Sequence, residues 1–224
     1  MRPIGPMRLT VTNYLDVISS WCHWAIPAWE ELRRRYCARV DFRWKIALMD
    51  EAAMPKTLAQ MEWYYRRSGM LMRSPIMLQA GWFEPGRGEY LEPNCVAEAA
   101  RDLGSEDDRA WIALSYAELR EGKTIGGWDT AAQVVAAATG LDRSKLLERA
   151  KSPEIEKRVR ASTAEFHAMQ VSQRPTFVIE TPIGDRAVFS GFARAEPLVA
   201  TIEAMLDDIA GYEAYAAHFG NPPE

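Results

Sequence analysis

Strand-forming segments lie at the two ends of this chain, and a long helical stretch separates them. Leu9–Leu15 and Val40–Ile46 each alternate β-forming residues, which predicts two strands. Between them, Pro27–Tyr36 has a helical composition. Strand, helix and strand with short joints make a βαβ unit, so the two strands should be parallel and joined by a right-handed crossover.

Strand signals return only near the C-terminal end. Thr176–Glu180 and Ala187–Phe189 flank a turn-rich tetrapeptide, Pro-Ile-Gly-Asp, which predicts a β-hairpin. Glu196–Ile209 then reads as an amphipathic closing helix. We expect residues 211–224, which end in Asn-Pro-Pro-Glu, to be a loose tail.

The stretch between the two strand pairs is helical in composition. Ser152 followed by Pro153, and Asp142 before 143–150, are typical helix starts, and Asn94, Ser105 and Asp129 also suit capping positions. The order therefore predicts a discontinuous α/β domain over residues 8–50 and 171–210. A helical insertion domain occupies residues 51–170, and a C-terminal tail occupies residues 211–224.

The composition limits which partners and which cellular compartment we expect for this protein. The chain has 224 residues, 48% hydrophobic and 26% charged, with a net charge of −4, which argues against a nucleic-acid partner. No stretch approaches the ~18 apolar residues of a membrane span, and the N-terminus lacks secretory features. Three cysteines and three histidines show no paired ligand spacing, so we expect no metal site and a reducing, cytoplasmic setting.

Two short segments resemble the DsbA family of thioredoxin-fold proteins. Residues 14–27, Tyr-Leu-Asp-Val-Ile-Ser-Ser-Trp-Cys-His-Trp-Ala-Ile-Pro, are similar to its cytoplasmic branch, where Asp ends the strand and Cys-Pro-Trp-Cys opens the helix. Residues 171–179, Val-Ser-Gln-Arg-Pro-Thr-Phe-Val-Ile, are similar to the loop whose proline is cis. The resemblance implies an α/β thioredoxin fold (βαβ…ββα) with a large all-helical insertion, and a cis bond before Pro175.

The motif can be matched in two ways. Setting Trp21-Cys22 on the family's Trp-Cys keeps Asp16 in place and puts Ser19 in the nucleophile position, which gives Ser-x-x-Cys. A shifted match makes Cys22 the nucleophile and Ala25 the resolving position. We favour the first match. Neither supplies the two thiols of dithiol exchange, so we do not expect a conventional dithiol oxidase.

The site residues follow from this resemblance. Kappa-class glutathione transferases and hydroxychromene-carboxylate isomerases resemble this fold and have serine in the nucleophile position, where it contacts the glutathione sulfur. The resemblance thus implies that Ser19 contacts the sulfur of glutathione, whereas the simpler interpretation is that Ser19 only caps the helix. Arg174, Pro175 and Thr176, with Trp21, form the expected substrate-binding set. Those enzymes carry Ser-Asp or Gln-Asp after the glycine, whereas Phe192 and Ala193 follow Gly191 here.

Cys22 and His23 complete the candidate catalytic set. His23 adjoins Cys22 and could lower its pKa or act as an acid or base, but neighbours in sequence do not share a helical face. Cys37 and Cys95 lie outside the motif.

Three functions remain open at this point. The chain could be a thiol-linked enzyme of the DsbA lineage, a glutathione-dependent isomerase or transferase, or a peptide-binding module without turnover. Ser19 favours the second, and the missing catalytic cysteine favours the third over oxidase activity. We lean towards an enzyme. No cofactor is certain, with glutathione the candidate, and the expected partners are a small thiol, a protein thiol or peptide, and a second copy in a homodimer.

Overall fold

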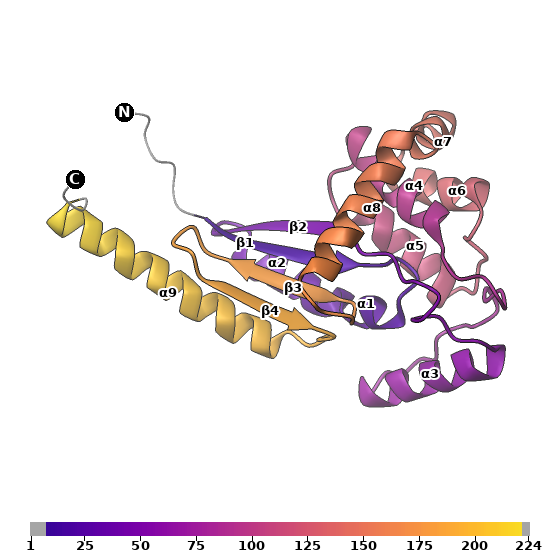
Figure 1. Cartoon of the computed structure of the whole chain (residues 1–224), viewed down its shortest axis with the longest axis horizontal. Coiled ribbons are helices and arrows are strands. Elements are labelled where there is room, and N and C mark those ends of the chain that lie inside the picture. The colour runs from indigo at the N-terminus through magenta and orange to yellow at the C-terminus, as the bar shows by residue number, and fades with distance from the viewer. Residues whose placement is uncertain (1–7, 221–224) are drawn as a thin grey trace.

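The structure, a computed structural model, describes residues 8–220 and combines a four-stranded sheet with a block of helices (Figure 1). The strands are β1 (Leu9–Leu15), β2 (Val40–Ile46), β3 (Thr176–Glu180) and β4 (Arg186–Ser190). The helices are α1 (Ser20–Trp24), α2 (Ile26–Tyr36), α3 (Leu58–Leu71), α4 (Leu91–Asp102), α5 (Arg109–Leu119), α6 (Trp128–Thr139), α7 (Arg143–Ala150), α8 (Pro153–Ala168) and α9 (Glu196–Phe219).

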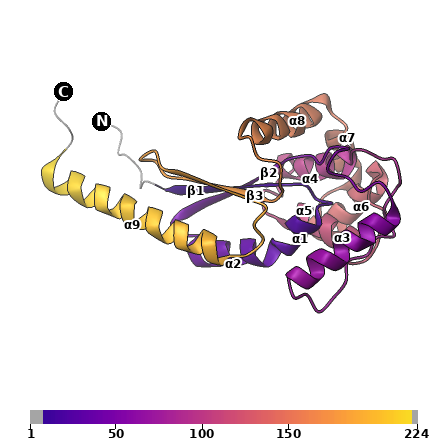
Figure 2. The same cartoon turned by 60° about the horizontal axis from the view of Figure 1, so that its bottom comes forward.

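The sheet has the order β2-β1-β3-β4. Strand β1 pairs in parallel with β2 and antiparallel with β3, and β3 and β4 form an antiparallel hairpin. Figure 2 shows α2 and α9 on one side of the sheet and α8 on the other. This is the βαβ…ββα arrangement of a thioredoxin fold with a helical insertion, so the predicted fold class is confirmed.

Large side chains fill the space between the sheet and α2. Trp29 is fully buried, and its ring lies 5.4 Å from Phe42 and 6.2 Å from Phe177. Leu32, one turn along, and Ile202 of α9 are also fully buried. Burial of side chains of this size contributes roughly 1.5–3 kcal/mol each. This packing fixes the position of α1 and α2 against the end of β1.

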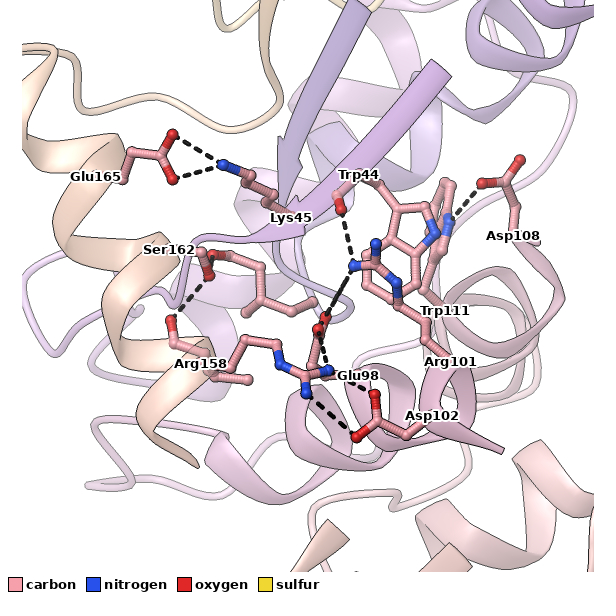
Figure 3. Close-up of polar contacts among 12 residues, drawn as sticks. Trp44, Lys45, Glu98, Arg101, Asp102, Asp108, Trp111, Arg158, Ser162 and Glu165 are labelled. Atoms are coloured by element: carbon pink, nitrogen blue, oxygen red, sulfur yellow. Dashed lines mark hydrogen bonds and ion pairs between the residues drawn. The ribbon is translucent and has the colours of Figure 1, made fainter. Parts of the chain in front are cut away.

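Helix α4 is the centre of the helical block. Five of its residues, Cys95, Val96, Ala97, Ala99 and Ala100, have no exposed surface. Their small side chains allow α6, α7 and α8 to pack closely around the helix. Glu98 of α4 is also buried, and its carboxylate accepts hydrogen bonds of 3.2 Å from both Arg101 and Arg158 (Figure 3). Arg101 also donates to the carbonyl of Trp44, which ties the block to the edge strand β2.

Three helix starts differ from the sequence prediction. Asn94 lies inside α4 rather than capping it, because its amide is engaged in contacts with the end of β1. Helix α5 begins at Arg109 with Asp108 at the N-cap, rather than at Ser105, and Asp129 lies within α6. Local capping propensity identified the neighbourhood of each start, but tertiary contacts set the residue.

The last helix is longer than predicted. Helix α9 continues from Ile209 through Gly211 to Phe219, so the expectation of a loose tail from residue 211 is wrong for residues 211–219. The segment is rich in alanine, a strong helix former, and a single glycine does not end it. Residues 221–224 lie outside the described part. Neither α9 nor any other helix within residues 8–220 is long and apolar enough to cross a membrane.

Candidate functional site

Ser19 caps the helix that follows the first strand. Its backbone is extended (φ −74°, ψ 121°), and its Oγ accepts a hydrogen bond of 3.3 Å from the amide of Cys22. This is the geometry that favours serine at an N-cap. The amide of Ser19 in turn donates to the carbonyl of Asp16 at 3.1 Å. Hydrogen bonds to a residue before Ser19 and to a residue after it therefore hold the turn between β1 and α1.

Asp16 anchors this turn to the rest of the molecule. It is fully buried, and its carboxylate accepts from the amide of Met49 at 2.7 Å, the side chain of Asn94 at 2.9 Å and the amide of Ile18 at 3.2 Å. Burial raises the pKa of Asp16, and these hydrogen bonds oppose the rise. Asn94 also accepts from the amide of Val17, so α4 of the helical block directly positions the segment before Ser19.

The loop before β3 lies against the same turn. The Arg174–Pro175 peptide is cis. The buried guanidinium of Arg174 donates to the carbonyls of Ala47 and Leu48 and lies 4.4 Å from the ring centroid of Phe166. Thr176 donates to the carbonyl of Gln173 at 2.7 Å. The side chains of Arg174 and Thr176 are thus occupied within the protein, which leaves the backbone of the loop for a ligand.

Gly191 contacts the loop that contains Gln173 and Pro175. Its amide donates to the carbonyl of Pro175 at 2.8 Å. Its φ of +78° lies in the left-handed region, and an added Cβ would be 3.1 Å from the Cβ of Gln173. Both facts favour glycine at this position. Neither the amide nor the carbonyl of Arg174 has a hydrogen-bond partner among residues 8–220, so a free backbone edge remains there.

Ser19 and Arg174 border a groove of about 420 Å³. Trp21 of α1 also lines it, and a second set of lining residues, Met61 and Tyr65 of α3 with Trp82, makes up what we call its second wall. The basic residues of the lining are Lys56, Arg67 and Arg174, and the lining contains no Asp or Glu. Pro175 and Thr176 are buried behind the lining. The structure therefore brings together Ser19, Trp21 and Arg174 of the predicted set, in a groove suited to an anionic, partly apolar ligand.

A larger hollow, of about 680 Å³, lies elsewhere, where β2 meets α4 and α8. Its lining includes the paired charges of Glu98, Arg101, Asp102 and Arg158 shown in Figure 3. None of the predicted site residues contributes to it. The groove beside Ser19 is therefore the candidate site.

Cys22 lies behind Ser19 rather than in the groove. It is 3% exposed, and burial raises the pKa of its thiol to about 12 despite the hydrogen bond from Ser19. Ala25, the resolving position of the shifted match, is also buried. Because thiolates rather than thiols are nucleophiles, the geometry favours the match that places Ser19, and not Cys22, in the nucleophile position.

His23 faces the helical block. Its Nε2 accepts a 2.6 Å hydrogen bond from the guanidinium of Arg120, and its Nδ1 lies 2.9 Å from the hydroxyl of Ser115. Because Nε2 accepts, the proton belongs on Nδ1, which donates to Ser115. Burial, followed by the charge of Arg120, lowers the pKa of His23 to about 4. The structure does not bring His23 to the groove, and Ser115 and Arg120 hold it neutral between α1 and α5.

The remaining cysteines belong to other elements than the motif. Cys95 is buried within α4, and burial raises the pKa of its thiol to about 12. Cys37 is exposed at the end of α2. All three cysteines are free. Within residues 8–220, no group of three or more His, Cys, Asp and Glu side chains could hold a metal ion.

Sequence reasoning missed the second wall of the groove. Met61, Tyr64 and Tyr65 of α3 line it, and their spacing of i, i+3 and i+4 places them on one helical face. That spacing was available as a signal, but the sequence did not indicate what the face packs against. It also missed Glu118 of α5, which is fully buried with no hydrogen-bond partner on either carboxylate oxygen.

Comparison with known proteins agrees with this geometry. A family model described as a DSBA-like thioredoxin domain matches residues 10–203. The chain belongs to that family. The match runs from β1 into α9, so both walls of the groove and the helical block lie within it. A search of curated proteins gave no match.

Solved structures of DSBA-like proteins share the fold. A candidate protein disulfide isomerase from Nitrosomonas europaea has 16% identity and a TM-score of 0.72, covering 90% of this chain and 98% of that protein. The cytosolic disulfide reductase DsbM from Pseudomonas aeruginosa has 16% identity and a TM-score of 0.70, covering 88% and 98%. DsbM has also been solved with GSH (16% identity, TM-score 0.68, coverage 88% and 99%). At these identities the likeness shows the fold alone.

Proposed function

We propose that this DSBA-like protein binds glutathione, or a closely related thiol peptide, in the groove and uses it for isomerase or transferase chemistry on a small electrophile. The observation that carries the proposal is the position of Ser19. Ser19, although only 6% exposed, belongs to the lining of the groove beside the Arg174–Pro175 loop, whereas the thiol of the motif, Cys22, is 3% exposed and does not.

The chemistry of Ser19 suits a bound sulfur atom. Its Oγ accepts from the amide of Cys22, so its own proton remains to be donated, and a hydroxyl proton rotates to suit its partner. A ligand thiol in the groove could take that proton in place of Cys22. A donated hydrogen bond favours the thiolate over the thiol, which lowers the thiol pKa and raises the fraction of nucleophile at neutral pH.

The rest of the groove supports the same ligand. The free amide and carbonyl of Arg174 could pair with the peptide part of a tripeptide as an added strand does. Arg67 forms no ion pair within the described residues, and Lys56, which pairs with Glu51 at 3.2 Å, is exposed, so both provide positive charge that suits a ligand with carboxylates. DsbM, a structural neighbour, has been solved with GSH. The three free cysteines agree with a reducing, cytoplasmic setting.

Calorimetric titration with reduced glutathione tests the proposal. Replacing Ser19 with glycine removes the hydroxyl yet costs the N-cap only a few tenths of a kcal/mol, so Ser19→Gly separates binding from folding. We expect wild type to bind reduced glutathione, Ser19→Gly to bind it at least tenfold more weakly, and the control Ser144→Ala, on the exposed surface of α7 and outside the groove, to bind it like wild type. Absence of binding by wild type, or equal binding by Ser19→Gly, would overturn the proposal.

A protein thiol or peptide is the second candidate ligand, favoured by the free backbone edge at Arg174. A peptide held by backbone pairing alone would not depend on the Ser19 hydroxyl. Under this alternative, extended peptides compete for the groove, Ser19→Gly binds them like wild type, and no turnover of electrophiles by glutathione is measured.

A further inference from the structure

Helix α3 carries an aromatic and basic face that the rest of the described chain leaves open. Trp63 and Met70 are 53% and 74% exposed, and Arg66 lies between them on the same side of the helix. The guanidinium of Arg67 lies 4.9 Å from the ring centroids of both Trp63 and Tyr64. An exposed tryptophan among arginines is typical of interface residues rather than of ordinary surface. We call residues 59, 63, 66, 67 and 70 the α3 face.

The end of α9 carries a second open surface. Tyr212, Tyr215 and Phe219 are 63%, 64% and 66% exposed, and their spacing places them on one side of the helix together with Asp208. The rings of Tyr215 and Phe219 are 4.6 Å apart. Figures 1 and 2 show this part of α9 running past the end of the sheet. We call residues 208–219 the α9 tail.

The two surfaces carry opposite charges. Helix α9 contains five acidic residues and neither lysine nor arginine, whereas residues 56–73, which include α3, contain four basic residues and one acidic residue. Arg66 and Arg67 of the α3 face, like Asp208 and Glu213 of the α9 tail, form no ion pair within residues 8–220. Complementary charges of this kind select a partner and set its orientation.

We propose that two copies of this chain form a symmetric dimer in which the α9 tail of each packs on the α3 face of the other. The two surfaces lie at opposite ends of the long axis of the molecule (Figure 1). An antiparallel pair of molecules related by a two-fold axis therefore brings both contacts together at once. Such an interface is closed, because each copy contributes the same two surfaces.

The area available is sufficient for a stable dimer. Aromatic side chains bury about 150–250 Å² each, so the three exposed aromatic residues of one tail offer roughly 300–500 Å². Two contacts, counted on both partners, then remove about 1,200–2,000 Å² from water, which is the range of specific protein interfaces. A single contact of this kind would bury about half as much area, the size of a weak, transient interface, so one contact supports only weak association and both are needed for a stable dimer.

The dimer would also place a neighbour beside the candidate site. Arg67 of the α3 face and its neighbour Tyr64 also line the groove. The tail of the partner subunit would therefore lie next to the groove entrance. This inference does not depend on the proposed function, because Trp63, Arg66 and the aromatic residues of the α9 tail do not line the groove, and it stands whether or not glutathione binds.

Sedimentation velocity of the full chain tests the dimer. We expect wild type to be a dimer at ~100 μM, since association follows protomer concentration. An α3 variant (Trp63→Ser with Arg66→Glu) and a tail variant (Tyr212→Ser with Tyr215→Ser) should each be monomeric. The control Phe192→Ser, which removes an exposed aromatic residue outside both surfaces, should remain dimeric. Circular dichroism of each variant checks that it is folded.

Mixing the two variants distinguishes this pairing from others. The α3 variant keeps an intact tail and the tail variant keeps an intact α3 face, so a mixed dimer has one complete contact. We expect the mixture to recover dimer, with weaker association than wild type. A monomeric wild type, an α3 variant that still dimerises alone, or a mixture that stays monomeric would overturn the proposal.

Discussion

Glu118 provides a stability prediction that depends on one buried carboxyl group. Both of its carboxylate oxygens are buried without a hydrogen-bond partner, and the nearby Tyr65 hydroxyl and Trp82 indole N–H are also unpartnered. Burial raises the pKa of Glu118 well above its ordinary value of 4.5, and the charge of Asp16 raises it further. An unpaired ionised carboxylate in such a place costs several kcal/mol, so the folded protein keeps Glu118 protonated.

The sign of the pH effect follows from linkage. In the unfolded chain Glu118 releases its proton above about pH 4.5, whereas in the folded chain it retains the proton until the pH reaches its raised pKa. The free energy of unfolding is therefore unaffected by this group at low pH and decreases as pH rises above the pKa of Glu118 in the unfolded chain. One extra proton held by the folded state corresponds to a loss of about 1.4 kcal/mol per pH unit.

Glu118→Gln removes this dependence because the amide cannot ionise. Urea unfolding of wild type and Glu118→Gln at about pH 5, 6 and 7 should show the variant gaining on wild type as pH rises, by up to about 1.4 kcal/mol for each pH unit. If the amide packs differently from the carboxyl group, the unfolding free energy of the variant changes by the same amount at every pH, so the pH dependence of the difference between variant and wild type is unaffected. The control Glu148→Gln, on the exposed surface of α7, should leave the slope of wild type unchanged. A pH-independent difference between wild type and Glu118→Gln would refute the reasoning.

Three further predictions concern the turn around Ser19. Ser19→Cys should form a reversible disulfide with Cys22, whereas Ala25→Cys should not. Titration of free thiols after mild oxidation measures disulfide formation in both variants. A disulfide that forms only in Ala25→Cys would support the shifted match. Cys22, with a thiol pKa of about 12, should resist alkylation in the native state while exposed Cys37 reacts readily, as mass spectrometry with and without urea would show. Asn94→Ala should lower stability by about 1–3 kcal/mol because it leaves buried groups unpartnered, and an unchanged urea midpoint would contradict that role.

The order and type of the elements could be predicted from the sequence because they depend on local patterns. The alternation in Leu9–Leu15 and the turn before β4 define strands whatever surrounds them. Asp142 and Gly140 act as a cap and a stop for the same reason. The family resemblance then supplied the position of Ser19 and the loop at Pro175, which local patterns alone do not provide.

Residues whose roles depend on distant partners could not be placed in this way. Asn94 has the composition of a cap, yet its side chain bonds to Asp16, which is 78 positions away in the sequence. His23 adjoins Cys22 in sequence, but the helix turns it towards Ser115 and Arg120 of the helical block. Such contacts depend on how the insertion packs against the sheet, and no local spacing encodes that packing.

The most direct test of the account is the pKa of a thiol held in the groove. Ultraviolet absorbance of the thiolate, followed against pH with glutathione bound to wild type and to Ser19→Gly, measures this pKa. The account predicts a bound thiol pKa below the ordinary ~8.5 of cysteine in wild type, and a return towards that value in Ser19→Gly, where the donated hydrogen bond is missing. An equal thiol pKa in the two proteins would contradict the assignment of Ser19 as the group that holds the sulfur.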